Sequence, residues 1–259
     1  MKRNFKLFKL LIKVSLFKAM TYRMDVVFGL LSSVIWLGVP VIFFKVVYLN
    51  VDQIAGWTFN ETILLVGVYT LIDGLMMSCL VSSMPSLEHD IREGTLDTIL
   101  LKPIIPQLYY LLHSIDFTQL LNSILGLVVI IYAARNLYFN LLQIVCFIIS
   151  CLFGCCLYYS LWFLWTISTF WFPTNFGRSD LFLSMIQIGR YPSSIYKGVG
   201  QILFNFIVPF GMIATPATMI LLRQNFEILL VQLIVTVVFI MLDIIFWKLG
   251  IRKYDGAGR

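Results

Sequence analysis

Charged residues are scarce in this sequence of 259 residues. Asp, Glu, Lys and Arg make up 12% of it, whereas a soluble domain carries about a quarter. Hydrophobic residues make up 60%, and the mean hydropathy is +0.91. These values exclude an ordinary soluble domain and indicate an integral membrane protein. The net charge of +6 therefore reports membrane topology rather than nucleic-acid binding.

Motifs of chemical catalysis and nucleotide binding are also lacking. No glycine is followed by lysine, so the chain has no Gly-x-x-x-x-Gly-Lys phosphate-binding loop. No His-Glu-x-x-His motif and no intramembrane array of paired carboxylates appears. His89 and His113 stand alone, and the cysteines act as small hydrophobes without nearby ligands, which argues against a metal site or disulfides. We therefore expect no enzyme activity and no cofactor in this chain. The cysteines are Cys79, Cys146, Cys151, Cys155 and Cys156.

The N-terminal segment has no uncharged run long enough for a signal peptide. Its lysines instead recur at helical spacing, and its large apolar residues keep a similar rhythm on another face. This pattern predicts a basic amphipathic helix over residues 1–23 that lies along an anionic membrane surface; the alternative is a solvated tail. The lysines are Lys2, Lys6, Lys9 and Lys13, and the apolar residues are Phe5, Phe8, Ile12 and Leu16.

Runs almost free of charge predict six membrane-spanning helices. Most are close to the roughly 20 residues that a helix needs to cross the hydrocarbon layer. Asp73 and Asp243 each interrupt one run, and the run of 42 residues from 136 to 177 can hold one long helix or two short ones. The runs are Val26–Phe44, Thr62–Leu87, Phe117–Ala134, Asn136–Gly177, Gly198–Leu222 and Ile228–Trp247.

The distribution of basic residues favours six spans over seven. Six spans place both termini, residues 83–113 and residues 172–200 on one side, and leave only Lys45, Arg135 and Arg223 on the other. Cytoplasmic loops of membrane proteins are enriched in Lys and Arg. We therefore expect both termini to be cytoplasmic.

The fifth predicted span contains Pro209, Gly211 and Pro216. Broken helix at membrane depth is tolerated where it is buried in protein or lines a cavity. We interpret the segment as a helix that breaks there and turns back in a short re-entrant piece. The alternative is a single kinked span, since prolines are ordinary in transmembrane helices.

A compact charged segment, residues 83–105, joins the second and third spans. Gly94 is expected to end one short helix ("SLEHDIRE") and Thr95 to cap a second ("LDTILL"). Asp97 falls in the first turn of that second helix, where the helix dipole favours a carboxylate, and Pro103 closes it. Such an element can lie on the membrane surface and face a partner protein.

This segment resembles a known family. "EHDIREGTLDTILLKP" (residues 88–103) is similar to the cytoplasmic coupling segment of ABC-2 type transporter permeases. "YPSSIYKGVGQILFNFIVPFGMIATPA" (residues 191–217) resembles the second signature of the six-helix, single-domain branch. The ending "WKLGIRKYDGAGR" is also similar, although "RKYDGAGR" departs from the usual form. The resemblance covers nearly the whole chain, residues 1–259, as one transmembrane domain.

The resemblance implies a permease subunit of an ABC exporter in a bacterial cytoplasmic membrane. Its partners would be separate ATPase subunits, which hold ATP and Mg, and a second permease subunit, identical or a similar sibling. The loop between spans two and three would dock on the ATPase and transmit its motion, with Lys102 and Pro103 fixing the exit of the loop. The implied contact residues are Glu88, Asp90, Arg92, Glu93, Gly94, Thr95, Leu96 and Asp97.

Acidic residues inside apolar spans are costly and therefore mark function or pairing. Asp116 and Asp243 lie near the ends of their spans, and we interpret both as structural. Asp73 is deeper, and it either faces a cavity of the dimer or bonds a polar neighbouring helix; protonation is a further way to tolerate it. Asp73 and the fifth-span residues Pro209, Gly211 and Pro216 are our candidates for the translocation path.

The aromatic-rich, largely uncharged spans favour a hydrophobic or amphipathic substrate, such as a peptide, a lipid-like or a drug-like compound. Two other classes of protein are considered. An ion-driven secondary transporter or channel would show matched broken helices in internal repeats, and the sequence shows one broken span. A membrane-embedded enzyme would need converging acid, base or nucleophile residues, which are lacking.

Overall fold

The computed structural model describes residues 23–112, 114–173 and 177–254. The described residues form helices joined by loops, with one isolated β-bridge between Ile54 and Trp57. Five of the described helices are long and apolar enough to cross a membrane, so the predicted all-α membrane protein is confirmed. These are α2 (Arg23–Val47), α3 (Phe59–Leu80), α7 (Phe117–Ala134), α8 (Leu141–Ile167) and α12 (Glu227–Lys253). The amphipathic helix predicted over residues 1–23 lies outside the described residues, apart from the first residue of α2.

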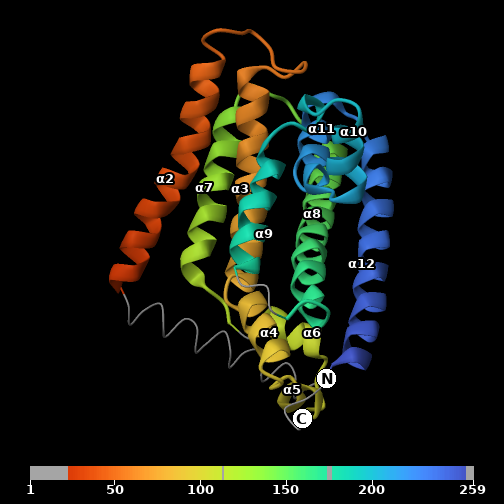
Figure 1. Ribbon diagram of the computed structural model, residues 1–259. Coiled ribbons are helices and arrows are strands. Elements are labelled where there is room, and N and C mark those ends of the chain that lie inside the picture. Colours follow the sequence, from red (N-terminus) through yellow and green to blue (C-terminus); the bar gives the residue numbers. More distant parts are fainter. Residues whose placement is uncertain (1–22, 113, 174–176, 255–259) are drawn as a thin grey trace.

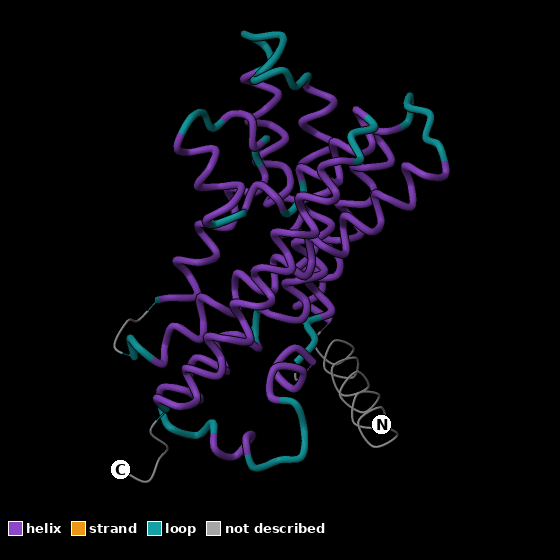
Figure 2. Tube along the Cα trace, turned by 90° about the vertical axis from the view of Figure 1, so that its right-hand side faces the viewer, coloured by secondary structure: helices purple, strands orange, loops and turns teal. Residues whose placement is uncertain are grey.

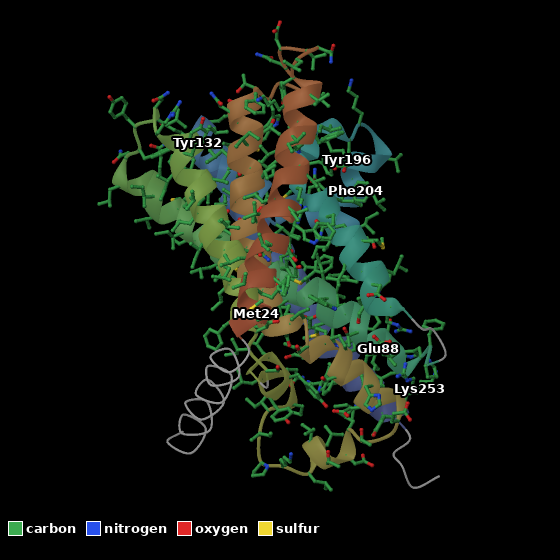
Figure 3. The ribbon with its side chains drawn as sticks, turned by 90° about the vertical axis from the view of Figure 1, so that its left-hand side faces the viewer. Met24, Glu88, Tyr132, Tyr196, Phe204 and Lys253 are labelled. Carbon is green, nitrogen blue, oxygen red and sulfur yellow. The ribbon has the colours of Figure 1, made fainter. Side chains whose placement is uncertain are left out.

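The long helices run side by side, and short helices gather at both ends of the bundle (Figure 1). One end carries α4 (Ser83–Arg92), α5 (Asp97–Leu100) and α6 (Pro106–Leu112), and we call it the α4–α6 end. The opposite end carries α10 (Val199–Ile202) and α11 (Thr215–Arg223). Figure 2 shows that most loops also lie at these two ends. Figure 3 places Glu88 and Lys253 near the first end and Tyr132 and Tyr196 toward the second.

Helix α3 is the central helix of the bundle. It is apolar around most of its circumference, which is typical of a helix surrounded by protein, and Leu64, Leu65, Val68 and Ile72 are fully buried. Helix α2, by contrast, exposes most of its apolar residues. The side chains of α3 therefore face other helices, whereas much of α2 is free to face lipid or another subunit.

Glycines allow α3 and α7 to approach closely. A Cβ atom at Gly126 of α7 would lie 2.5 Å from the backbone nitrogen of Leu71, and one at Gly74 of α3 would lie 2.5 Å from that of Ser123. The hydroxyl of Ser123 donates a hydrogen bond to the carbonyl of Leu71 across this contact, at 3.1 Å. Small residues hold helices together in membranes, where lipid tails are as apolar as leucine.

Buried polar side chains join α8 to α12. Ser150 donates to the side-chain oxygen of Gln232 at 2.6 Å, and the Gln232 amide donates to the carbonyl of Met212 at 2.9 Å. Further along, the hydroxyl of Ser160 donates to Asp243 at 2.5 Å. The structure thus supports the structural role expected for Asp243.

Asp116 also has the structural role expected for it. Its carboxylate accepts hydrogen bonds from the backbone nitrogen of Thr118, at 2.9 Å, and from the Thr118 hydroxyl, so it caps the start of α7. Its own backbone nitrogen donates to the carbonyl of Ser78 at 2.8 Å. This link ties the start of α7 to the end of α3.

The segment that crosses the bundle between α8 and α12 is not the predicted fifth span. Helix α9 (Arg178–Ile186) and the 3₁₀ turn η2 (Gln187–Arg190) lead from the α4–α6 end toward the other end (Figure 1). Ser179, at the start of α9, donates to Glu88 of α4. Ser194, in η3 (Ser193–Ile195), bonds Trp57 at the opposite end. The chain therefore crosses most of the bundle before residue 198.

The predicted span Gly198–Leu222 is therefore wrong. It is divided into α10, the π-helical turn η4 (Leu203–Ile207), the 3₁₀ turn η5 (Phe210–Met212) and α11, at the end opposite α4–α6. The break expected between Pro209 and Pro216 does occur, but within this cap of short helices. Apolar composition alone misled the assignment, because the buried residues of η5 and α11 and the exposed residues of α10 and η4 are all as apolar as those of a membrane span. The basic residues Arg190 and Lys197 consequently do not share the α4–α6 end.

Candidate functional site

The charged segment has the expected helix, turn and second helix. Helix α4 ends at Arg92, and Gly94 takes the left-handed conformation with φ of +75° before α5 begins. Glycine adopts this conformation without the steric cost that a Cβ atom would add. The amide of Leu96 donates to the carbonyl of Asp90 at 3.2 Å and closes the turn. Gly94 thus sets the angle between the two short helices.

Thr95 does not cap α5 as the sequence suggested. The residue at the cap position is Leu96, whose side chain makes no capping hydrogen bond to this four-residue helix. The Thr95 hydroxyl instead donates to Asp90 at 2.8 Å, back across the turn. The reason is geometric: the left-handed Gly94 brings Thr95 over the end of α4, where a carboxylate is available. Asp97 keeps its predicted place in the first turn of α5.

Two acidic residues of the predicted contact set face into the protein. Glu88 is buried, 8% exposed, and accepts a hydrogen bond from Ser179 of α9 at 3.2 Å. Asp90 accepts a second hydrogen bond, from the Tyr110 hydroxyl of α6 at 2.5 Å. Sequence spacing identified these carboxylates but could not tell which of them bind within the chain.

Burial and the hydrogen bond to Asp90 raise the pKa of Tyr110 well above its ordinary value. The phenol therefore stays protonated and remains a donor to the Asp90 carboxylate under all ordinary conditions. Through this bond α6 is fixed to α4, and the turn at Gly94 is held from both sides. The segment is an ordered part of the fold.

Of the remaining residues of the set, Gly94 and Leu96 are buried, and the others lie on a more exposed surface, which we call the α4–α5 surface. Arg92 and Glu93 form an ion pair at 3.2 Å with side chains 28% and 51% exposed. Apolar Leu101 and Ile105, which sequence reasoning did not single out, are also strongly exposed there, at 86% and 62%. The α4–α5 surface consists of Arg92, Glu93, Thr95, Leu101, Lys102, Pro103 and Ile105.

A second candidate site is a polar cavity of about 570 Å³ within the bundle. It is lined by α2, α3, the start of α7, α9 and η2. Asp73 lines it from α3, seven residues before the end of that helix. At 1.5 Å per residue this is about 10 Å from the end of α3. The cavity therefore lies among the long helices and not at the surface of an end cap.

Asp73 bonds a neighbouring helix, one of the roles that the sequence left open, and it also lines the cavity within the single chain. It lines the cavity, and it also accepts a hydrogen bond from the hydroxyl of Tyr158, on α8, at 2.9 Å. Its side chain is 7% exposed. Asp73 thus joins α3 to α8 while it presents a carboxylate to the cavity.

The cavity contains a basic residue that sequence reasoning missed. Arg190 of η2 lines it, with the guanidinium over the rings of Tyr69, at 5.3 Å, and Trp36, at 6.0 Å. The Arg190 Nε atom is buried without a hydrogen-bond partner, as is the side-chain oxygen of Gln187, one turn earlier. The available signal was the half-length apolar stretch between Arg178 and Arg190, which is too short for a span but too apolar for a surface loop.

The predicted path residues of the fifth span are not brought together with Asp73. Pro209 and Gly211 flank or lie in η5, and Pro216 is in the first turn of α11, where proline suits a helix start. Gly211 leaves room for the chain itself, since a Cβ there would lie 2.6 Å from the side-chain oxygen of Asn205. None of the three lines the described cavity. They shape the end cap.

Metal chemistry finds no support in the described part of the chain. Within it, no cluster of His, Cys, Asp and Glu has the geometry of a metal site. The cysteines of the described ranges are free, and His89 is exposed on α4. His113 lies outside the described residues.

Comparison with known proteins identifies the family. Residues 34–258 match the family model described as ABC-2 family transporter protein. Comparison with curated proteins and with solved structures gives no match. The match covers most of the chain, including the whole of α3 to α12. The chain therefore belongs to the ABC-2 family of transporter proteins.

Proposed function

We propose that this chain is the transmembrane permease subunit of an ABC exporter in a bacterial cytoplasmic membrane. Its family membership supports a permease. The observation that carries the coupling role is the α4–α5 surface, where an ion pair and two exposed apolar residues stand on a segment fixed from within by Asp90 and Tyr110. Leu101 and Ile105 together expose apolar area beside a charged rim on a rigid element, and this arrangement suits a protein-docking surface.

The partner that binds this surface is a separate ATPase subunit, which holds ATP and Mg. The α4–α6 end, together with both chain termini, is then cytoplasmic. Binding of the ATPase displaces α4, and Glu88 is bonded to Ser179 at the start of α9. Because α9 leads to Gln187 and Arg190 in the cavity, this bond offers a direct physical connection between the docking surface and the cavity.

The translocation path is formed with a second permease subunit, identical or similar. Helix α2 supports this assignment because its apolar side chains are widely exposed and it forms one wall of the cavity. A substrate that reaches the cavity from the membrane has to be hydrophobic or amphipathic. Peptide, lipid-like and drug-like compounds belong to this class.

The coupling role is tested by charge reversal on the α4–α5 surface. The double variant Arg92→Glu with Glu93→Arg should fold normally, because an exposed ion pair contributes about 0–1 kcal/mol to stability. At a docked interface, mispaired charges cost several times more, so substrate-stimulated ATP hydrolysis by the reconstituted complex should be lost. Gly94→Val should also abolish it by blocking the left-handed turn.

The matched control is Asp52→Lys, which reverses an exposed charge at the opposite end of the bundle. This control should keep full stimulation, and all variants should elute as single peaks in size-exclusion chromatography. The permease purified alone should not hydrolyse ATP. Full stimulation of both α4–α5 variants would exclude this surface as the coupling element.

A further inference from the structure

The cavity beside α9 holds polar groups that the protein itself does not satisfy. The buried Nε of Arg190 and the buried side-chain oxygen of Gln187 have no hydrogen-bond partner among the described residues. Buried polar groups in native proteins are nearly always paired. Two unpaired groups one turn apart, a cationic donor and a neutral acceptor, therefore indicate a place for an external polar ligand.

The guanidinium of Arg190 is held in position by aromatic rings, close enough to Asp73 for their charges to interact. It lies over the rings of Tyr69 and Trp36, and contacts of this kind hold a cation through the ring face while its N–H groups remain free in the plane. Arg190 forms no ion pair with Asp73, which lines the same cavity. The described cavity thus offers a fixed cation and a fixed carboxylate that do not pair directly.

The carboxylates determine the charge that a ligand must carry. Asp73 accepts a hydrogen bond from the hydroxyl of Tyr158 and lies within hydrogen-bonding reach of Tyr69, and Asp180 of α9 lines the same cavity. A purely anionic ligand would face both carboxylates. A neutral ligand would add no charged contact to Arg190 or Asp73, which interact with each other only at a distance beyond an ion pair. A ligand with one anionic and one cationic group satisfies both kinds of residue.

We propose that this cavity binds the zwitterionic head of an amphipathic substrate, with its anionic group on Arg190 and its ammonium group on Asp73. The side-chain oxygen of Gln187 accepts a further hydrogen bond from the ammonium group. Apolar Trp36, Leu37 and Leu183 line the same cavity and contact the adjoining apolar part of the substrate. This inference rests on the proposed function, because it names the substrate class of the same permease.

Two sources carry this chemistry, an amino-phospholipid and an acylated amino acid. The first pair of probes is dihexanoyl phosphatidylethanolamine and dihexanoyl phosphatidylglycerol, which both carry phosphate but differ in the ammonium group. The second pair is Nε-lauroyl-lysine, with a free α-amino acid head, and N-lauroyl-glycine, which is only anionic. Binding to the purified permease in maltoside micelles is measured by isothermal titration calorimetry, without the ATPase.

The zwitterionic member of at least one pair should bind about tenfold more tightly than its anionic counterpart, which is the effect of one charge-assisted hydrogen bond. Which pair shows the preference identifies a phosphate or a carboxylate head. Asp73→Asn should remove the preference and leave binding of the anionic probe unchanged or stronger. Arg190→Gln should weaken both members of the pair by about tenfold.

The control for Arg190→Gln is Arg223→Gln, which removes a guanidinium that also lies over a tryptophan, Trp57, but outside the cavity. It should bind the probes as the unaltered protein does. Gln187→Leu, a change at a residue with no side-chain bond to lose, should weaken zwitterion binding even if the charged variants fold poorly.

Equal affinity for the zwitterionic and anionic members of both pairs, or no binding of any probe, would overturn the proposal. These results do not depend on ATP hydrolysis. A permease that shows no preference for the zwitterionic probe but couples to the ATPase contradicts this inference and leaves the proposed function intact. A permease that binds the zwitterionic probe but never stimulates an ATPase contradicts the proposed function alone.

Discussion

The contact between α3 and α7 gives a sharp test of the fold. In Gly126→Ala the added Cβ would lie 2.5 Å from the Leu71 nitrogen and 2.9 Å from the Gly67 oxygen. These are backbone atoms, so no side chain can rotate away, and the two helices must separate. Overpacking of this kind costs about 1–3 kcal/mol.

Gly38→Ala, in α2, is the matched control. It makes the same change inside a membrane helix, but its Cβ would have no neighbour within 4 Å. Both variants gain the helix propensity of alanine over glycine, about 1 kcal/mol. The difference between the two variants therefore isolates the clash between α3 and α7.

The measurement is thermal unfolding of each variant in the same detergent, followed by the loss of the monodisperse peak in size-exclusion chromatography. A chain of this size shifts by about 2–4 °C for each kcal/mol, so Gly126→Ala should melt several degrees below Gly38→Ala. Gly74→Ala, whose Cβ would meet the Ser123 nitrogen at 2.5 Å, should behave like Gly126→Ala. Equal melting of all three variants would refute the close packing of α3 on α7.

Two further predictions concern the α4–α6 end and the topology. Tyr110→Phe should lower the free energy of unfolding by about 1.5–3 kcal/mol, because Asp90 loses a charge-assisted hydrogen bond; Tyr138→Phe, at a fully exposed residue, should have no effect in the same melting assay. In a protein without its native cysteines, Lys197→Cys should react with an impermeant maleimide from outside the cell and Ser86→Cys only after permeabilisation. Labelling of both from the same side would contradict the placement of residues 191–198 opposite α4–α6.

Much of the fold could be predicted from the sequence because apolar length is a direct physical requirement of the membrane. The long helices α2, α3, α7, α8 and α12 lie where charge-free runs predict them. The helix and turn of residues 83–97 follow from Gly94, whose backbone conformation is a local property of the residue. Local rules therefore identified these elements.

The fifth element and the cavity could not be predicted in the same way. The stretch from Gly198 to Leu222 is as apolar as a span, and only its contacts show that it folds into short helices at one end. Arg190 was assigned to the loop of residues 172–200 because the distribution of basic residues placed that loop on the cytoplasmic side. Its position beside Tyr69 depends on a partner more than a hundred residues away, and no local pattern contains that information.

Likewise, the resemblance placed Glu88 and Asp90 among the expected contact residues, but the sequence did not show the direction in which they point. Both accept hydrogen bonds from within the chain. Leu101 ends the apolar run of the predicted second helix ("LDTILL"), and the sequence does not show that it is exposed whereas Ile99 is buried. Side-chain direction at a helix end depends on the neighbours across the turn, here Ser179 and Tyr110.

The contacts between α3 and α7 and between α8 and α12 affect how the helices can move. Close backbone contact at Gly74 and Gly126 locks α3 to α7, and buried bonds at Gln232 and Asp243 lock α12 to α8. Each pair should therefore move as one rigid body. Helices α8 and α12, with 27 residues each, are about 40 Å long. A displacement at one end of such a pair rotates the whole pair and so moves its other end, because interdigitated helices shift as units and do not bend continuously. The bond from Tyr158 to Asp73 joins the two pairs, and because Asp73 also lines the cavity, a shift of one pair against the other would reach the cavity wall through this bond.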